Sequence, residues 1–141
     1  SSSGYLFHKK IPGNLFQNIA DKIYLITPNT DEAGILTGKS GNTEQDLQHR
    51  TKNNSCSILI KGGHLKGNRK DDILYSNGNR TILSGNSLDG YDKHGTGCVL
   101  SSAIAAGLAL DMTLEESCRT AKIYTRKFIM SNKTLLGYHY E

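Results

Sequence analysis

The sequence predicts an α/β fold in which helices pack on a mostly parallel sheet, and three observations lead to this class. Two short apolar runs, Ile23–Thr27 and Ser57–Lys61, are separated by segments of helical pattern. The stretch 97–110 is rich in Ala, Ser and Leu, and an amphipathic helical pattern follows it. Strands that alternate with helices are typical of sheets whose parallel strands are joined by right-handed crossovers.

The first strand is expected at Ile23–Thr27, after a short helical pattern over 14–20. This run is continuously apolar, as in a parallel strand that is covered on both faces. Pro28 ends the strand because it has no backbone N–H to donate. A short helix is then expected over Thr30–Leu36, and the glycine at position 38 closes it.

A second helix is expected to begin at Asn42 or Thr43, where the spacing of Asn42 and Gln45 is that of a capping box. Its polar composition indicates an exposed helix that ends near Asn54. The second buried strand, Ser57–Lys61, follows, and two glycines end it.

A β-hairpin is predicted next. Asp72–Tyr75 and Arg80–Leu83 are short apolar runs on either side of Ser76-Asn77-Gly78-Asn79. An Asn-Gly pair between two such runs is a strong local signal for a tight hairpin turn.

Two helices complete the predicted elements after a polar loop over 85–94. The stretch 97–110 has hardly a polar side, so we expect a buried helix. Thr113 and Glu116 have the capping-box spacing for the last helix. The residues predicted to face the core on that helix are Leu114, Ser117, Cys118, Ala121, Phe128 and Ile129.

The length of 141 residues predicts one domain. That domain is expected to be incomplete, because two parallel strands and a hairpin fall short of the five or six strands, roughly, of an average sheet. Residues 1–141 are therefore predicted to form a single partial domain whose strands need neighbours from elsewhere.

Composition excludes several classes of function. The net charge is +4 with a pI near 9.0, but no long basic run with interleaved aromatic residues indicates nucleic-acid binding. No stretch reaches the roughly 18 apolar residues of a membrane helix, and the N-terminus lacks the pattern of a signal peptide. Three cysteines without a CxxC pair suit reduced thiols, so a cytoplasmic location is expected.

The sharpest functional pattern is His94-Gly95-Thr96-Gly97-Cys98, where a loop enters the helix at 97–110. Glycines let backbone N–H groups turn toward one point, and a helix N-terminus adds about half a positive charge. This combination favours an anion site for a phosphoryl group. A tight turn without a ligand is the alternative. Cys98, in the first turn, is a candidate base or nucleophile, or else a small packing residue.

Two further patterns follow the predicted strands, at the edge where ligands of open α/β sheets bind. Asn29 and Glu32 can face one point and offer an amide and a carboxylate to Mg²⁺, or they cap the helix. Lys61 can meet a phosphate as a point charge, or it is a surface lysine, and Gly63 allows a close backbone approach. The three patterns together supply what Mg-ATP phosphoryl transfer needs.

The order of these motifs resembles a known family. The chain contains, in order, ITPNTDEA, LTG, LIKGGH, HGTGC, LSSAIAAGLAL and LGYH. This series, from Ile26 to His139, is similar to the hydroxymethylpyrimidine/phosphomethylpyrimidine kinases of thiamine biosynthesis, within the ribokinase superfamily. The resemblance implies a ribokinase-like three-layer α/β/α fold with a mostly parallel sheet, of which this chain is the C-terminal, nucleotide-binding half.

The resemblance also implies roles for individual residues. Asn29 and Glu32 correspond to the family's NxxE motif, which is associated with Mg²⁺ and phosphate. Lys61 corresponds to the lysine near the ATP phosphates, and Gly63 to the nucleotide loop. The segment Gly95, Thr96 and Gly97 corresponds to the anion hole. Cys98 stands where ribokinase relatives place an aspartate base, and a cysteine there is characteristic of the pyrimidine kinases.

The family's first half, which supplies most contacts to the pyrimidine, has no counterpart in these residues. The expected activity, ATP-dependent phosphorylation of hydroxymethylpyrimidine and its monophosphate, therefore belongs to a longer protein, and we expect this chain alone to be inactive. A homodimer is implied by the resemblance. The alternatives are a pyridoxal kinase-like enzyme, a non-catalytic nucleotide-binding half that needs a partner chain, and a truncated remnant that self-associates through its strand edges.

Overall fold

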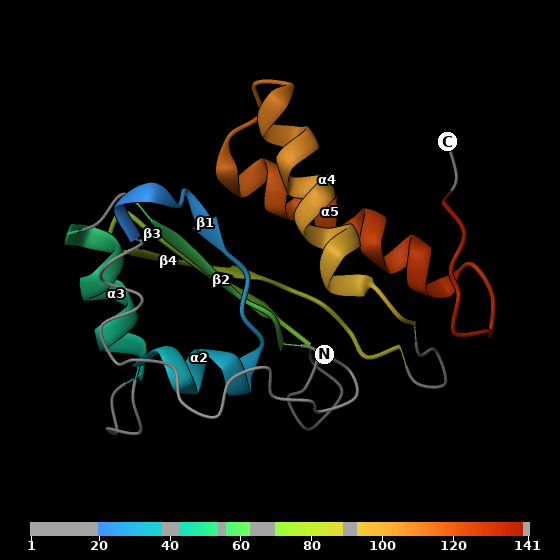
Figure 1. Cartoon of the computed structure of the whole chain (residues 1–141), viewed down its shortest axis with the longest axis horizontal. Helices are drawn as coiled ribbons and strands as arrows, with labels where there is room; N and C mark the ends of the chain where they lie inside the picture. The colour runs from blue at the N-terminus through green and yellow to red at the C-terminus, as the bar shows by residue number, and fades with distance from the viewer. Residues whose placement is uncertain (1–19, 38–42, 54–55, 63–69, 89–92, 140–141) are drawn as a thin grey trace. The chain divides into compact units, whose positions relative to one another are not determined.

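The computed structural model describes residues 20–37, 43–53, 56–62, 70–88 and 93–139. The chain divides into two compact units, Ser1–Ser87 and Leu88–Glu141, each with its own elements (Figure 1). The expectation that 1–141 form one partial domain stays a prediction.

The first unit contains a four-stranded sheet in the order β1-β2-β3-β4. β1 (Leu25–Ile26) pairs in parallel with β2 (Ser57–Ile60), while β3 (Asp72–Ser76) runs antiparallel to both β2 and β4 (Asn79–Leu83). The α/β class and the parallel pairing of the first two strands are confirmed. Among the described strands the sheet is mixed, because the hairpin adds two antiparallel pairings to the parallel one.

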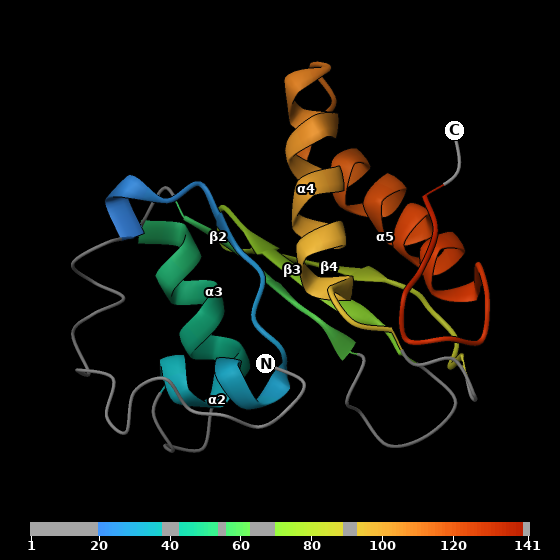
Figure 2. The same ribbon diagram turned by 45° about the vertical axis from the view of Figure 1, so that its right-hand side comes forward.

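Helices lie against one face of this sheet. A 3₁₀ turn, Ala20–Lys22, precedes β1, and α2 (Thr30–Thr37) and α3 (Thr43–Asn53) connect β1 to β2. α3 packs across β2, β3 and β4 (Figure 2). The two helices predicted between the first two strands are thus confirmed. The helical pattern predicted at 14–20 lies outside the described residues, apart from residue 20. The predicted cap at Asn42 also lies outside them.

The core of the first unit forms where these helices meet the sheet. Its buried members are Ala20, Ala33, Leu47, Cys56, Ile58, Ile60 and Tyr75. Leu59, which alternates with Ile58 and Ile60 along β2, is also completely buried. Both faces of β2 are therefore covered, as its continuous apolar run predicts.

The first strand is shorter and less buried than expected. The predicted run Ile23–Thr27 contains only two strand residues, both half-buried, and the side chain of Tyr24 is 57% exposed. The reason is its position, because among the described strands β1 lies at the edge of the sheet and has a single neighbour, β2.

The predicted hairpin is confirmed. Asp72 pairs with Leu83 and Ser76 with Asn79, so the turn consists of Asn77 and Gly78. Both residues have positive φ, 51° and 76°, as the tight turn that matches strand twist requires.

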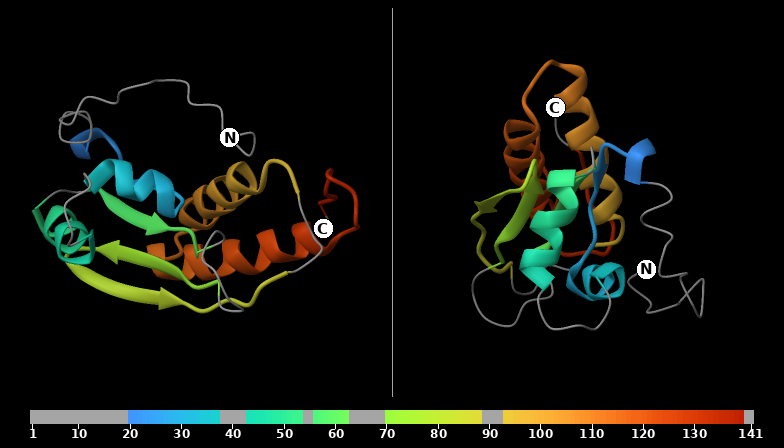
Figure 3. Two further views of the ribbon diagram at one scale, coloured as in Figure 1. Left: turned by 90° about the horizontal axis from the view of Figure 1, so that it is seen from below. Right: turned by 90° about the vertical axis from the view of Figure 1, so that its left-hand side faces the viewer.

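The second unit is a helical hairpin. α4 (Thr96–Ala109) and α5 (Leu114–Met130) lie side by side (Figure 3). They approach closely at Gly107, where a Cβ atom would lie 2.8 Å from Oγ of Ser117. Glycine is therefore required by the contact between the helices.

The start and the core face of α5 agree with the sequence. Thr113 Oγ1 accepts a hydrogen bond from the Glu116 N–H at 3.3 Å, and the Thr113 N–H donates to Glu116 Oε2 at 2.9 Å, which confirms the capping box. The buried residues of α5 are Ser117, Cys118, Ala121, Thr125 and Phe128. Leu114 and Ile129, also predicted to face the core, are half-buried.

The expectation that 97–110 is buried on nearly all sides is wrong. Only Leu100, Ile104 and Gly107 are buried, and Leu110 at the end of the helix is 76% exposed. A helix that is apolar on all sides becomes fully buried only if other elements pack on every side of it. Within its unit, α4 packs against α5, so the sides of α4 that face away from α5 stay exposed. None of the described helices has the length and apolar character that a membrane crossing requires.

A glycine substitution tests the packing at the end of β2. The Gly62 N–H donates to Asp72 Oδ1 at 2.8 Å, and a Cβ atom at Gly62 would lie 1.9 Å from the carbonyl oxygen of Asp71. We expect Gly62→Ala to lower the free energy of unfolding by about 1–3 kcal/mol, because the added methyl group forces backbone movement. Urea denaturation measures this loss.

Gly34 in α2 is the matched control, since a Cβ atom there meets no atom within 4 Å. Gly34→Ala should raise the free energy of unfolding by roughly 0.5–1 kcal/mol, the usual gain from replacing glycine inside a helix. Equal effects of the two substitutions would contradict the close approach at Gly62.

Candidate functional site

Two of the predicted site residues lie next to each other where β1 and β2 end. Asn29 and Lys61 form an isolated parallel bridge just beyond the two strands. The Lys61 N–H donates to the carbonyl oxygen of Pro28 at 2.9 Å. The parallel pairing therefore continues past the strands and brings an amide and an ammonium side chain to the same edge of the sheet, as predicted.

Asn29 and Glu32 cap the start of α2. The Glu32 N–H donates to Asn29 Oδ1 and the Asn29 N–H donates to Glu32 Oε2, each at 2.8 Å. This reciprocal pair is a capping box. Of the two interpretations of this motif, helix capping is thus confirmed by the contacts, and it fixes both side chains at the carboxyl end of β1.

Asn29 and Glu32 offer Mg²⁺ only a few protein ligands. Glu32 is exposed and Asn29 is half-buried, so a hydrated ion can approach them. Mg²⁺ keeps several of its waters and is commonly held by one or two carboxylates together with substrate phosphates. No cluster of three or more His, Cys, Asp or Glu side chains suited to a metal occurs among the described residues. At this place the chain offers an ion one carboxylate and one amide.

Lys61 and the glycines that follow it have different roles. Lys61 is half-buried, and within the described part of the chain its ammonium group makes no hydrogen bond or ion pair. Gly62 is required by its contact with the Asp71 backbone, which is a packing role. Gly63, predicted to lie in a nucleotide loop, is outside the described residues.

In the second unit, the glycine motif forms the start of α4. Gly95 is the N-cap residue and has a left-handed backbone, with φ 78° and ψ 5°. A Cβ atom there would meet nothing within 4 Å, so it is the backbone angle that favours glycine. The first bond of the helix runs from the Val99 N–H to the Gly95 carbonyl oxygen at 2.9 Å.

The start of α4 differs from those of α2 and α5. Both of those helices have a capping box, whereas no side chain caps α4. The first N–H groups of a helix have no partner inside the helix, and here these belong to Thr96, Gly97 and Cys98. Uncapped N–H groups together with the helix dipole favour an anion at this position.

The three cysteines are free thiols in two kinds of environment. Cys56 and Cys118 are buried, which confirms their packing role, and burial raises the pKa of the Cys56 thiol despite a hydrogen bond with the Ile26 backbone. Cys98 is exposed in the first turn of α4. Its alternative role as a small buried residue is therefore excluded.

Comparison with known proteins agrees with this geometry. Residues 1–140 match the model of a family described as phosphomethylpyrimidine kinase. The chain belongs to the phosphomethylpyrimidine kinase family. The resemblance to the hydroxymethylpyrimidine/phosphomethylpyrimidine kinases is thereby confirmed.

Two relatives in this family are each about twice as long as the chain. A hydroxymethylpyrimidine/phosphomethylpyrimidine kinase of Aquifex aeolicus is 39% identical over 121 residues, which are 83% of this chain and 47% of the relative. The enzyme of the same name from Rhizobium meliloti is 33% identical over 115 residues, which are 78% of this chain and 43% of the relative. The chain thus spans about half the length of the relatives that it matches.

Two solved structures of similar fold are pyridoxal kinases. One from Bacillus subtilis, in complex with ADP, is 27% identical with a TM-score of 0.67, over 84% of this chain and 48% of that chain. One from Staphylococcus aureus with ADP, at 24% identity and a TM-score of 0.71, covers 83% of this chain and 45% of that chain and supports the fold alone. The ribokinase-like fold class is therefore confirmed, and these neighbours are kinases that were solved with a nucleotide.

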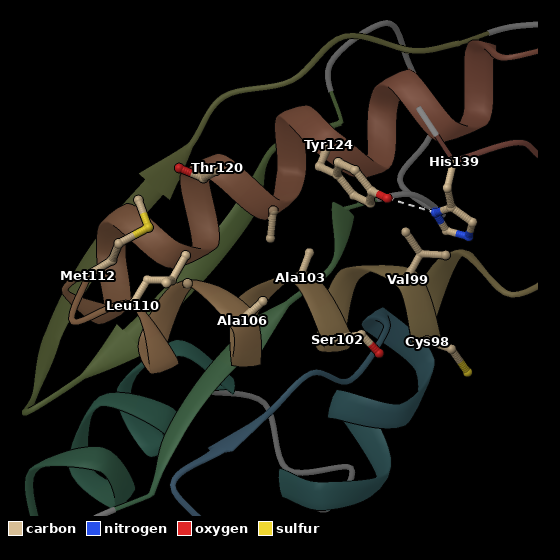
Figure 4. A pocket seen from close by; sticks show the side chains of 12 residues that line it. Cys98, Val99, Ser102, Ala103, Ala106, Leu110, Met112, Thr120, Tyr124 and His139 are labelled. Atoms are coloured by element: carbon tan, nitrogen blue, oxygen red, sulfur yellow. Dashed lines mark hydrogen bonds between the residues drawn. The ribbon is translucent and has the colours of Figure 1, made fainter. Parts of the chain in front are cut away.

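A groove lies between α4 and α5 near the glycine motif of this family member. Its volume is about 540 Å³ and its lining is mostly apolar. Figure 4 shows Tyr124 and His139 facing each other at one end, with Val99 opposite and Cys98 at the start of α4. Tyr124 Oη lies 2.8 Å from His139 Nδ1, and the two rings are stacked. The sequence analysis did not anticipate this groove.

The sequence analysis also missed Lys93, which lies just before the glycine motif. Its ammonium group bonds to the segment after α5, at Asn132 and Thr134. The available signal was a basic residue two positions before the glycine turn, but the residues that it contacts lie far away in the sequence. The contact itself could not be predicted.

The predicted site residues therefore form two groups. Asn29, Glu32 and Lys61 lie together at the sheet edge of the first unit, and the segment Gly95–Cys98 lies at the start of α4 in the second. The two groups lie in different units. That both groups act on one nucleotide therefore stays a prediction.

Substitution of Asn29 tests the cap of α2. Asn29→Ala removes the oxygen that accepts the Glu32 N–H, and we expect it to lower the free energy of unfolding by about 1 kcal/mol. Asn29→Asp keeps an acceptor at the same place and should stay within a few tenths of the wild-type value, since both residues are good N-caps. Urea denaturation compares them, and an alanine variant of wild-type stability would show that the cap contributes nothing.

Proposed function

We propose that these residues form the nucleotide- and phosphate-handling half of an enzyme that transfers the γ-phosphoryl group of ATP to 4-amino-5-hydroxymethyl-2-methylpyrimidine and to its monophosphate. The observation that carries the proposal is the uncapped start of α4 with Cys98 in its first turn, in a chain of the phosphomethylpyrimidine kinase family. Its free thiols suit the cytoplasm, where cysteines stay reduced.

In this proposal the N–H groups of the Gly95–Gly97 segment bind the oxygens of the phosphoryl group in the transition state of the transfer. These donors are free of a side-chain cap and aligned with the helix dipole, and they need little reorganisation when charge spreads over those oxygens. The Lys61 ammonium, which lies where β2 ends, binds a phosphate oxygen of ATP as a point charge. Both groups stabilise negative charge, which is the main task in phosphoryl transfer.

Cys98 accepts or relays the proton of the acceptor hydroxyl. It is exposed, and it lies in the first turn of α4 beside the uncapped N–H groups. A base is needed because the hydroxyl oxygen loses its proton as it bonds to phosphorus. The sulfur and the anion-binding N–H groups belong to the same helical turn, so one element positions both.

Asn29 and Glu32 hold Mg²⁺ in this proposal, directly or through its waters. Mg²⁺ held by these two side chains would neutralise part of the negative charge of the ATP phosphates. The capping box keeps Glu32 Oε2 on the Asn29 N–H, which restrains the carboxylate at the sheet edge beside Lys61. These side chains therefore bind and orient the ion rather than enclose it.

Gly97→Val tests the anion site. A branched side chain in the first turn of α4 shields the N–H groups from a phosphoryl group, so we expect kcat to fall by about 10²–10³-fold, the usual cost of losing such a donor. Steady-state kinetics of the complete polypeptide that the gene encodes measure this loss, with the melting temperature recorded alongside.

Ala109→Val is the control, because it also places a valine in α4, at the exposed last residue of the helix. It should keep the wild-type kcat. Normal turnover by Gly97→Val would contradict the anion-site proposal.

The identity of residue 98 predicts the acceptor. A pyridoxal kinase-like activity is the second candidate, because a solved neighbour that is 27% identical to this chain is a pyridoxal kinase. Because Cys98 is characteristic of the pyrimidine kinases, we expect kcat/KM for the hydroxymethylpyrimidine to exceed that for pyridoxal. A coupled ADP-release assay with each acceptor measures both values, and a preference for pyridoxal would support the second candidate.

A further inference from the structure

The loop that enters α4 is tied to the segment that follows α5. The Lys93 ammonium donates to the carbonyl oxygen of Asn132 at 2.6 Å, to Asn132 Oδ1 at 3.0 Å and to the carbonyl oxygen of Thr134. One residue later, the His94 N–H donates to the Leu135 carbonyl oxygen at 3.0 Å. Two consecutive residues immediately before Gly95 are therefore held by one short segment.

The contacts of Lys93 use all of its donors. An ammonium group has three N–H donors, and three oxygens of Asn132 and Thr134 accept from it. No donor is left for a phosphate in this arrangement. The three acceptors are uncharged amide groups, so the contact anchors the loop without neutralising the lysine.

The segment that accepts these bonds is itself braced. Asn132 Oδ1 also accepts from the Thr134 N–H at 2.7 Å, and Asn132 Nδ2 donates to the Leu136 carbonyl oxygen at 2.9 Å. Further along, a Cβ atom at Gly137 would lie 2.6 Å from the ring of Phe128 in α5, so the segment packs against that helix. The oxygens around Lys93 thus have a fixed position relative to α5.

The turn at the start of α4 needs such support from outside. Gly95 has a left-handed backbone and no side chain that could cap the helix. Glycine has the widest range of allowed backbone angles of all residues. The direction of the N–H groups at Thr96 and Gly97 therefore depends on how the chain enters the turn, and Lys93 and His94 are the residues at that entry.

We infer that Lys93 is a positioning residue for phosphoryl transfer. By binding Asn132 and Thr134, it fixes the turn at Gly95–Gly97 against the α4–α5 hairpin and keeps the N–H groups aimed at one point. The inference rests on the proposed function of these N–H groups. A donor set that is held in place before the reaction stabilises the transition state more than one that must reorganise.

Lys93→Met in the complete polypeptide tests this inference. Methionine keeps an unbranched apolar side chain and removes the three donors. We expect kcat to fall by about tenfold to a hundredfold, the range in which a small misplacement of reacting groups reduces rates. The KM of the acceptor should stay unchanged, and hydrogen exchange of the amides at 94–98 should become faster.

Lys133→Met is the matched control, because it removes the same charge from an exposed lysine of the same segment. It should match the wild type in kcat and in hydrogen exchange. A Lys93→Met enzyme with the kcat of the control overturns the inference. A rise in the KM of ATP alone, with unchanged kcat and exchange, also overturns it, because Lys93 then contacts the nucleotide directly.

Asn132→Ala covers the case in which Lys93→Met does not fold. It leaves the lysine in place and removes the Oδ1 acceptor and its brace to Leu136. Lower kcat with faster exchange at 94–98 supports the inference, and wild-type values of both overturn it. If the wild-type polypeptide has no kinase activity, the proposed function fails, whereas an active wild type with an equally active Lys93→Met defeats only the positioning role.

Discussion

The first N–H groups of every helix lack partners inside the helix, and the way in which this chain satisfies them organises its functional residues. α2 and α5 close their ends with capping boxes, Asn29 with Glu32 and Thr113 with Glu116. α4 begins at Gly95, which has no side chain to offer. Among these three helices, the same requirement thus produces two capped starts and one uncapped start. The helix dipole favours an anion at this open start, and the proposed phosphoryl-binding site lies there for that reason.

An open helix start has a structural cost, which the rest of the second unit offsets. Without a cap, and with glycine at the turn, nothing local fixes the direction of the N–H groups. The segment after α5 supplies this restraint through Lys93 and Asn132, and it packs on α5 through Gly137 and Phe128. α4 and α5 in turn approach closely at Gly107. The geometry of the glycine motif therefore depends on the whole helical hairpin.

In the first unit, the two residues that cap α2 are also the residues proposed to bind a metal ion. Asn29 and Glu32 cap α2, and the same cap places them beside Lys61 where the parallel strands end. The cap and a metal ion use the same kinds of oxygen, and the carboxylate retains a second oxygen when Oε2 is engaged. A cap at this edge holds the side chains in position before a ligand arrives, which reduces the ordering that binding requires.

The sequence by itself determined the local elements and led to the chemistry that is proposed for them. The Asn-Gly turn, the capping box at Thr113 and the glycine motif all act between residues close in the chain, so short patterns suffice to predict them. Only the tertiary structure decided the exposure of α4, the shortness of β1 and the contact of Lys93 with Asn132. These depend on which surfaces meet, and the Lys93–Asn132 bond joins residues 39 positions apart. A single sequence contains no local signal for such a pair.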